Sequence, residues 1–135
     1  MNIVRNILAA IIGIVIGNIV NMGIILIGMS VIAPPVGVDP SDMESIKAGM
    51  HLFETKHFLF PFVAHAGGTF VAALVAALIA VSGRKIITCI IGGLFLLGGI
   101  AACFMIPAPA WFMAFDILLA YIPMAFFGWK ISGNP

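Results

Sequence analysis

Four long apolar runs constrain the fold of this chain more than any other feature. They cover residues 7–32, 58–81, 86–106 and 110–129. A helix needs roughly 20 apolar residues to cross about 30 Å of hydrocarbon, and only a helix or a closed barrel satisfies every backbone polar group there. Composition agrees, because 63% of the residues are hydrophobic and only 8% are charged. We therefore predict an all-α membrane protein that crosses the bilayer several times.

The length of the chain leaves room for little besides these runs. The 135 residues accommodate four spans, which we place at approximately 5–32, 58–82, 85–106 and 110–130, with one long loop and two short connections. We predict a single four-span domain, residues 1–135, folded as a transmembrane four-helix bundle. Because four helices enclose little interior, assembly as a homo-oligomer or with another membrane protein is expected.

Basic residues indicate the orientation in the lipid bilayer. Short connections that carry lysine and arginine stay on the cytoplasmic side, and four such residues fall on one side of the predicted spans: Arg5, Arg84, Lys85 and Lys130. We predict a bacterial inner-membrane protein with both termini in the cytoplasm. The long loop on the outer side is acidic, and the basic content is too low to predict a nucleic-acid partner.

The long loop has a helical pattern of its own. Ser41 to Glu44 match the S-x-x-E capping box, in which side chains satisfy the first free amides of a helix. Apolar residues then recur at spacings of three and four, at Met43, Ile46, Met50 and Phe53. We predict a short amphipathic helix at approximately 41–55 that lies on the outer membrane surface or caps the bundle.

Two of the spans carry packing signals. Gly13 and Gly17 form a GxxxG pair on one face of the first span, which allows another helix backbone to approach closely. Pro123 in the fourth span leaves the carbonyl of Leu119 without its usual amide partner. Tyr121 and Trp129 need no functional explanation, since Trp129 stands where aromatic residues anchor a span at the headgroups.

The most informative residues are polar side chains inside the spans. An ionised side chain at the bilayer centre costs about 2.5 to 3.5 kcal/mol on insertion scales, and such residues commonly mark functional sites. Asp116 and His65 both fall in the outer third of their spans and can meet if spans two and four are neighbours. We predict a polar pocket that opens outward and is formed by Asp116, His65, Asn21 and Thr69, with Asn18 on an adjoining face.

A structural interpretation of the same residues stays open. An aspartate–histidine pair can be an interhelical hydrogen bond that fixes packing, and asparagine commonly joins helices in this way. Such hydrogen bonds contribute on average about 0.6 kcal/mol in membrane proteins. Because this is less than the insertion cost of Asp116, stability alone is a weak reason to place a carboxyl group there.

Metal and enzyme chemistry are weakly signalled. His51, Glu54 and His57 recur every three residues, but they cannot converge on one metal ion from one straight helix. Polar residues on the exposed side of an interfacial helix would give the same pattern. We therefore predict no metal site and no cofactor. Signatures such as HExxH, GxSxG and the phosphate loop are absent from the sequence, so an enzyme is less expected than a binding protein.

Two stretches resemble a group of small, uncharacterised bacterial four-span membrane proteins. They are His57 to Thr69 (HFLFPFVAHAGGT) and Pro107 to Ala125 (PAPAWFMAFDILLAYIPMA), and the resemblance extends over the whole chain. It implies that four spans make up the complete protein, and it implies no activity, substrate or cofactor. No characterised family shows these motifs.

Together these features favour a small membrane protein whose polar pocket binds or transports a small solute or a proton, with the lipid bilayer as its surroundings. Two alternatives stay open. One is a structural or accessory subunit of a larger membrane complex. The other is a membrane-embedded enzyme that uses a histidine–aspartate or metal site.

Overall fold

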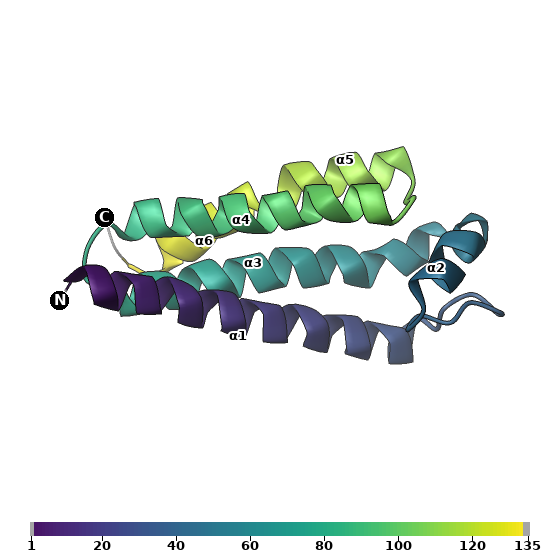
Figure 1. Cartoon of the computed structure of the whole chain (residues 1–135), viewed down its shortest axis with the longest axis horizontal. Coiled ribbons are helices and arrows are strands. Elements are labelled where there is room, and N and C mark those ends of the chain that lie inside the picture. Colours follow the sequence, from purple (N-terminus) through teal and green to yellow (C-terminus); the bar gives the residue numbers. More distant parts are fainter. Residues whose placement is uncertain (1, 134–135) are drawn as a thin grey trace.

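The computed structural model describes residues 2–133. Its helices run side by side along the length of the molecule (Figure 1): α1 (Asn2–Val31), α3 (Leu59–Ile79), α4 (Arg84–Met105), α5 (Ala110–Leu119) and α6 (Ile122–Ile131). Four segments of the described chain are long and apolar enough to cross a membrane: Asn2–Val31, Thr55–Ile79, Arg84–Met105 and Ala110–Ile131. The predicted all-α fold with four membrane-spanning helices is confirmed.

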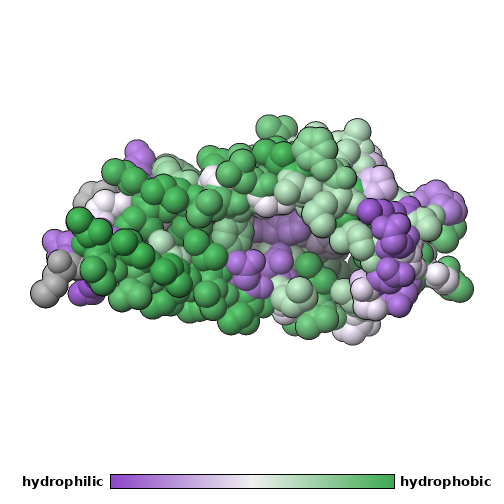
Figure 2. Space-filling view, viewed as in Figure 1, coloured by the Kyte–Doolittle hydropathy of each residue, from purple (hydrophilic) through white to green (hydrophobic). Residues whose placement is uncertain are grey.

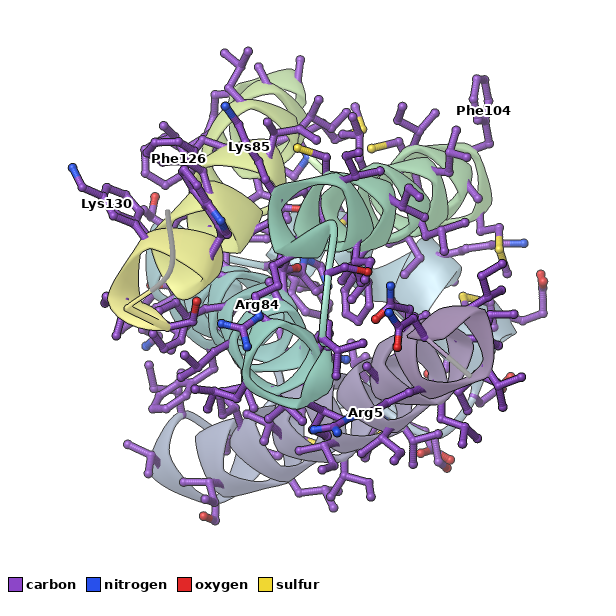
Figure 3. The ribbon with its side chains drawn as sticks, turned by 90° about the vertical axis from the view of Figure 1, so that its left-hand side faces the viewer. Arg5, Arg84, Lys85, Phe104, Phe126 and Lys130 are labelled. Carbon is purple, nitrogen blue, oxygen red and sulfur yellow. The ribbon has the colours of Figure 1, made fainter. Side chains whose placement is uncertain are left out.

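The two ends of the bundle differ in charge. The first turn of α1 and the last turn of α6 lie together at one end, called here the terminal end, and the long loop after α1 lies at the other, called the loop end (Figure 1). The terminal end carries basic side chains, as Figure 3 shows from that side: Arg5, Arg84, Lys85 and Lys130. This distribution is the one that the cytoplasmic assignment of both termini requires, and the assignment itself stays a prediction.

Small residues fill the interior, whereas large apolar side chains cover the outside. Six alanines of α3 and its C-cap are fully buried: Ala64, Ala72, Ala73, Ala76, Ala77 and Ala80. Large side chains such as Leu97 and Phe104 are 63% and 89% exposed, and the face in Figure 2 is mostly hydrophobic. Lipid tails are as apolar as leucine, so helices in a membrane associate through close packing of small residues instead. The arrangement is consistent with a membrane protein.

The GxxxG pair forms the seam between α1 and α3. A Cβ atom added at Gly17 would come within 2.5 Å of the Gly68 carbonyl oxygen, and one at Gly68 within 2.8 Å of the Gly17 carbonyl oxygen. Gly13 meets Ala72 and Ala76 in the same way. The predicted packing face of the first span is confirmed. Figure 1 shows α3 between α1 and α4, and α1 contacts α4 only sparsely.

Hydrogen bonds close the terminal end. Asn6 donates to the backbone carbonyl and side-chain hydroxyl of Ser82, both at 3.0 Å, and its side-chain oxygen accepts from the Val81 amide. Arg5 donates to the Ile79 carbonyl at the C-terminus of α3. The turn between α3 and α4 then passes through Gly83, whose φ of +59° favours glycine. α1 is thereby fixed to this turn.

The loop helix is shorter than predicted and begins later. α2 spans Met43–Gly49, and a short 3₁₀ turn (η1, Met50–Leu52) follows it. The residue that caps α2 is Asp42, whose side chain accepts from the Glu44 amide. Ser41 cannot take that position, because its amide and hydroxyl both donate to Asp39, which lowers the pKa of the Asp39 carboxyl. The predicted Ser41 capping box is therefore wrong.

The fourth span is a broken helix. α5 ends at Leu119 and α6 begins at Ile122, and Tyr121 at the break has φ −114° and ψ −79°. Pro123 explains the break, because its ring excludes the carbonyl four residues earlier and it has no amide hydrogen to donate. The sequence predicted only that the Leu119 carbonyl would lack its amide partner. In the structure the helix is fully interrupted at this point.

Candidate functional site

Asp116 and His65 lie directly against each other. Each is six residues after the first residue of its helix, Ala110 in α5 and Leu59 in α3, so both lie about 9 Å along a helix from the loop end. Nδ1 of His65 is 2.9 Å from each carboxylate oxygen of Asp116. The Asp116 side chain is 6% exposed and that of His65 is 26% exposed. The expected meeting of these residues is present, and the role of the pair stays a prediction.

Tyr121 completes the cluster. Its hydroxyl donates to the second carboxylate oxygen of Asp116 at 2.7 Å, and the residue is 2% exposed. Its ring also stacks on the imidazole of His65, with centroids 5.9 Å apart and an interplanar angle of 27°. The Asp116 carboxyl group therefore has two donors in the interior of the bundle. We call His65, Asp116 and Tyr121 the polar cluster.

The broken helix is what allows Tyr121 to reach Asp116. Residues five apart on a continuous α-helix point about 140° away from each other, so this bond requires the interruption at the start of α6. Gly99 of α4 provides the space, because a Cβ atom there would overlap the Tyr121 hydroxyl and ring, with Cε2 only 2.6 Å away. Pro123 and Gly99 thus position the tyrosine.

A hollow of about 300 Å³ leads from the loop end to the polar cluster, and we call it the end hollow. Its walls are mainly methionine, isoleucine and phenylalanine side chains from α1, the long loop, α3, α4 and α5. The charged or titratable side chains that line it are few: Lys56, His57, His65, Cys103 and Asp116. The acidic residues of the long loop, Asp39, Asp42, Glu44 and Glu54, do not line it.

A second hollow of about 320 Å³ opens on the side of the bundle between α1 and α4, and we call it the side hollow. It is lined by polar groups from α1, α3 and the break, Asn18, Asn21, His65 and Tyr121, and by apolar groups such as Leu94. Figure 2 shows a recessed hydrophilic patch in the middle of the hydrophobic face, between these two helices. Both hollows reach His65, Gly99 and Ala102.

The remaining predicted pocket residues have different surroundings. Asn21 faces the side hollow, and its side-chain oxygen is buried without a hydrogen-bond partner within residues 2–133. An unpaired buried acceptor of this kind costs about 1 to 3 kcal/mol. Asn18 is exposed and donates to the Ile14 carbonyl. Thr69 is fully buried and lines neither hollow. Its hydroxyl donates to the His65 carbonyl one turn earlier in α3, so its contact is with the helix backbone and not with a pocket.

The weak metal candidates have structural partners. Glu54 and His57 form a reciprocal capping box at the start of η2 (Thr55–Phe58), in which Nδ1 of His57 accepts from the Glu54 amide at 2.8 Å. His51 is exposed in the preceding turn. In the part of the chain that the structure describes, no group of three His, Cys, Asp or Glu side chains could hold a metal ion.

Hydrogen bonding defines what the polar cluster can do chemically. A carboxylate only accepts hydrogen bonds, so an ionised Asp116 requires the proton of a neutral His65 to be on Nδ1, and Nε2 then keeps its lone pair. A carboxylate that orients an imidazole in this way is found where the other ring nitrogen binds a ligand or moves a proton. Nε2 has no protein hydrogen-bond partner among the described residues.

Tyr121 is the site residue that sequence reasoning missed. Its separation of five residues from Asp116 argues against contact on a regular helix. The available signal was Pro123, because a proline inside a span predicts a local break that can bring such residues together.

No family model, curated protein or solved structure matches the chain at a significant level. The fold and composition are those of a helical multi-span membrane protein. The function must therefore be argued from the geometry of the polar cluster and the two hollows.

Proposed function

We propose that this protein binds a small, mostly apolar solute that carries one polar group, as the binding step of its uptake or transport. The observation that carries the proposal is the polar cluster, which lies at a helix break and contributes His65 and Asp116 to the lining of the end hollow. Discontinuous helices inside a membrane occur where the backbone is buried in protein or lines a cavity, and transporters place their substrate sites there.

The lining favours this class of solute over a hydrated ion. Ligand pockets are typically about 300 to 1,000 Å³, mostly apolar, with a few polar groups that orient the ligand. The end hollow has this character, since methionine, isoleucine and phenylalanine side chains predominate and His65 and Asp116 lie at its inner limit. An ion or a proton pathway would need polar groups along its length. Proton movement by the His65 imidazole stays the second candidate, favoured by the Asp116 contact.

The basic terminal end supports a particular orientation. If the four basic residues of the terminal end, labelled in Figure 3, are cytoplasmic, as charge bias in short connections favours, the end hollow opens on the outer side of the membrane. The solute would then enter from outside the cell, or from the periplasm of a Gram-negative bacterium. A cysteine-labelling experiment with a membrane-impermeant maleimide tests the orientation through Ser41→Cys in the long loop.

Phenol is a suitable probe of the end hollow, because it is small, largely apolar and carries one hydroxyl group. We expect saturable binding of radiolabelled phenol to the protein in lipid nanodiscs, measured by equilibrium dialysis against empty nanodiscs. Cys103→Phe fills the end hollow from α4 and should weaken binding at least about tenfold, or about 1.4 kcal/mol. His65→Gln should weaken binding by a similar factor without filling the hollow.

Cys89→Phe is the matched control. Cys89 is on the same helix, is exposed, and lines neither hollow, so phenol should bind this variant as it binds the original protein. Circular dichroism and gel filtration establish that each variant is folded. Absence of saturable binding, or equal binding by the Cys103→Phe and Cys89→Phe variants, would contradict the proposal.

A further inference from the structure

We propose that the side hollow is an opening to the lipid through which a membrane-dissolved aliphatic alcohol brings its hydroxyl group to His65. The inference rests on the proposed function and adds a route of entry and a ligand class. The tail of the ligand stays in the bilayer, and its head occupies the space between α1 and α4. The end hollow remains the route for a solute that enters from water.

The packing of α1 supports the route. α1 is held along the glycine seam to α3 and contacts α4 only sparsely. The resulting gap lies in the middle of a face that is otherwise hydrophobic, where lipid tails would surround the protein (Figure 2). Polar groups at this depth are unfavourable unless they face protein or a ligand. The gap leads inward to His65 and Tyr121.

The hydrogen-bonding groups in the side hollow select the ligand class. The side-chain oxygen of Asn21 is buried and has no donor within the described residues. Nε2 of a neutral His65 is a second acceptor, because Nδ1 is engaged by Asp116. Each of these acceptors lacks a donor, and a ligand hydroxyl group can donate its one proton to Nε2 of His65, which an ether or an ester cannot do. The apolar side chains of Ile14, Leu94 and Phe95 suit a hydrocarbon body.

Gly98 allows a direct test of the route. It lines the side hollow but not the end hollow, and a Cβ atom added there would have no other atom within 4 Å. Gly98→Phe should therefore fill the opening without disturbing the fold. Gly93→Phe is the matched control, because Gly93 is on the same helix, has equal space around it and lines neither hollow.

The readout is the ¹⁵N resonance of Nε2 of His65, recorded on protein in nanodiscs with labelled histidine and assigned by its loss in the His65→Gln variant. 1-Dodecanol, which partitions into the bilayer, should shift this resonance saturably with its mole fraction in lipid. Gly98→Phe should raise the half-saturating mole fraction at least about tenfold, and Gly93→Phe should leave it unchanged. Dodecyl methyl ether, which has no donor, should cause no shift. Asn21→Leu should weaken the response to dodecanol.

The outcomes separate this inference from the proposed function. If phenol shifts the resonance, Cys103→Phe removes that shift and dodecanol causes none, the end hollow is a binding site and the lateral route is wrong. If neither probe shifts it, both proposals fail. If dodecanol acts equally on the Gly98→Phe variant, or if the ether acts as well as the alcohol, the lateral opening or the hydroxyl preference is overturned.

Discussion

The two halves of α3 pack against their neighbours in different ways. In the terminal half, helices approach through glycine and alanine, as at Gly128, where a Cβ atom would come within 2.7 Å of the Phe70 carbonyl oxygen. In the loop half, aromatic rings separate α3 from α5, with centroids of Phe62 and Phe115 4.7 Å apart. Both hollows lie in or border the loop half, where His65 is located.

This difference shows how one helix can serve both stability and a site. Small residues give close backbone packing and leave no room for a ligand. Aromatic spacers and a broken helix hold the neighbours apart, so that polar groups can lie around a space. The terminal half then keeps the bundle assembled while the loop half stays open.

The largest expected effect is at the glycine seam between α1 and α3. Gly17→Leu forces a side chain against the Gly68 carbonyl oxygen and should lower the free energy of unfolding by about 3 kcal/mol. Gly23→Leu on the same helix should have little effect, because nothing lies within 4 Å of a Cβ atom there. Unfolding with SDS in mixed micelles measures both. Equal destabilisation by the two variants would show that the seam is not closely packed.

The polar cluster should be the most sensitive part of the loop half. Asp116→Ala removes the acceptor of Tyr121 and His65, which should cost about 2 kcal/mol of unfolding free energy, because a buried donor is left unpaired. Asp116→Asn keeps the shape and should cost less, yet phenol binding should still fall about tenfold. If binding by the Asp116→Asn variant is unchanged, the aspartate is a packing residue only.

Tyr121→Phe should have a smaller effect. It removes one hydrogen bond to Asp116 while His65 still contacts both carboxylate oxygens, and interhelical bonds in membranes are worth about 0.6 kcal/mol on average. The same SDS titration measures the loss. A loss several times larger would mean that Tyr121, rather than His65, is the main partner of the carboxylate.

Gly98→Phe should have the smallest effect on stability. Its side chain enters open space, so the unfolding free energy should change by less than about 0.5 kcal/mol. Gly17→Leu and Gly98→Phe both replace a glycine with a large apolar residue. The difference between their unfolding free energies therefore measures how much closer α1 packs to α3 than to α4. Strong destabilisation would indicate that α1 and α4 are in close contact there.

The fold could be predicted well because each span and the GxxxG pair are defined by residues that are close together in the sequence. Span lengths and the α1 packing face follow from composition and helical periodicity. The meeting of His65 and Asp116 was anticipated only as a consequence of spans two and four being neighbours. The start of α2 was wrong because Asp39 engages Ser41, and Tyr121 was missed because its position depends on the break at Pro123. The hollows depend on the spacing between helices, which no local pattern encodes.

The location of a bound ligand tests the central claim most directly. Crystals grown from a lipid phase with 4-bromophenol would locate the bromine by its anomalous scattering. We predict a bromine site in a hollow that reaches the polar cluster, with the phenol oxygen within about 3.2 Å of Nε2 of His65. Bromine found only on the lipid-facing surface, with His65 unoccupied at saturating ligand, would contradict the account.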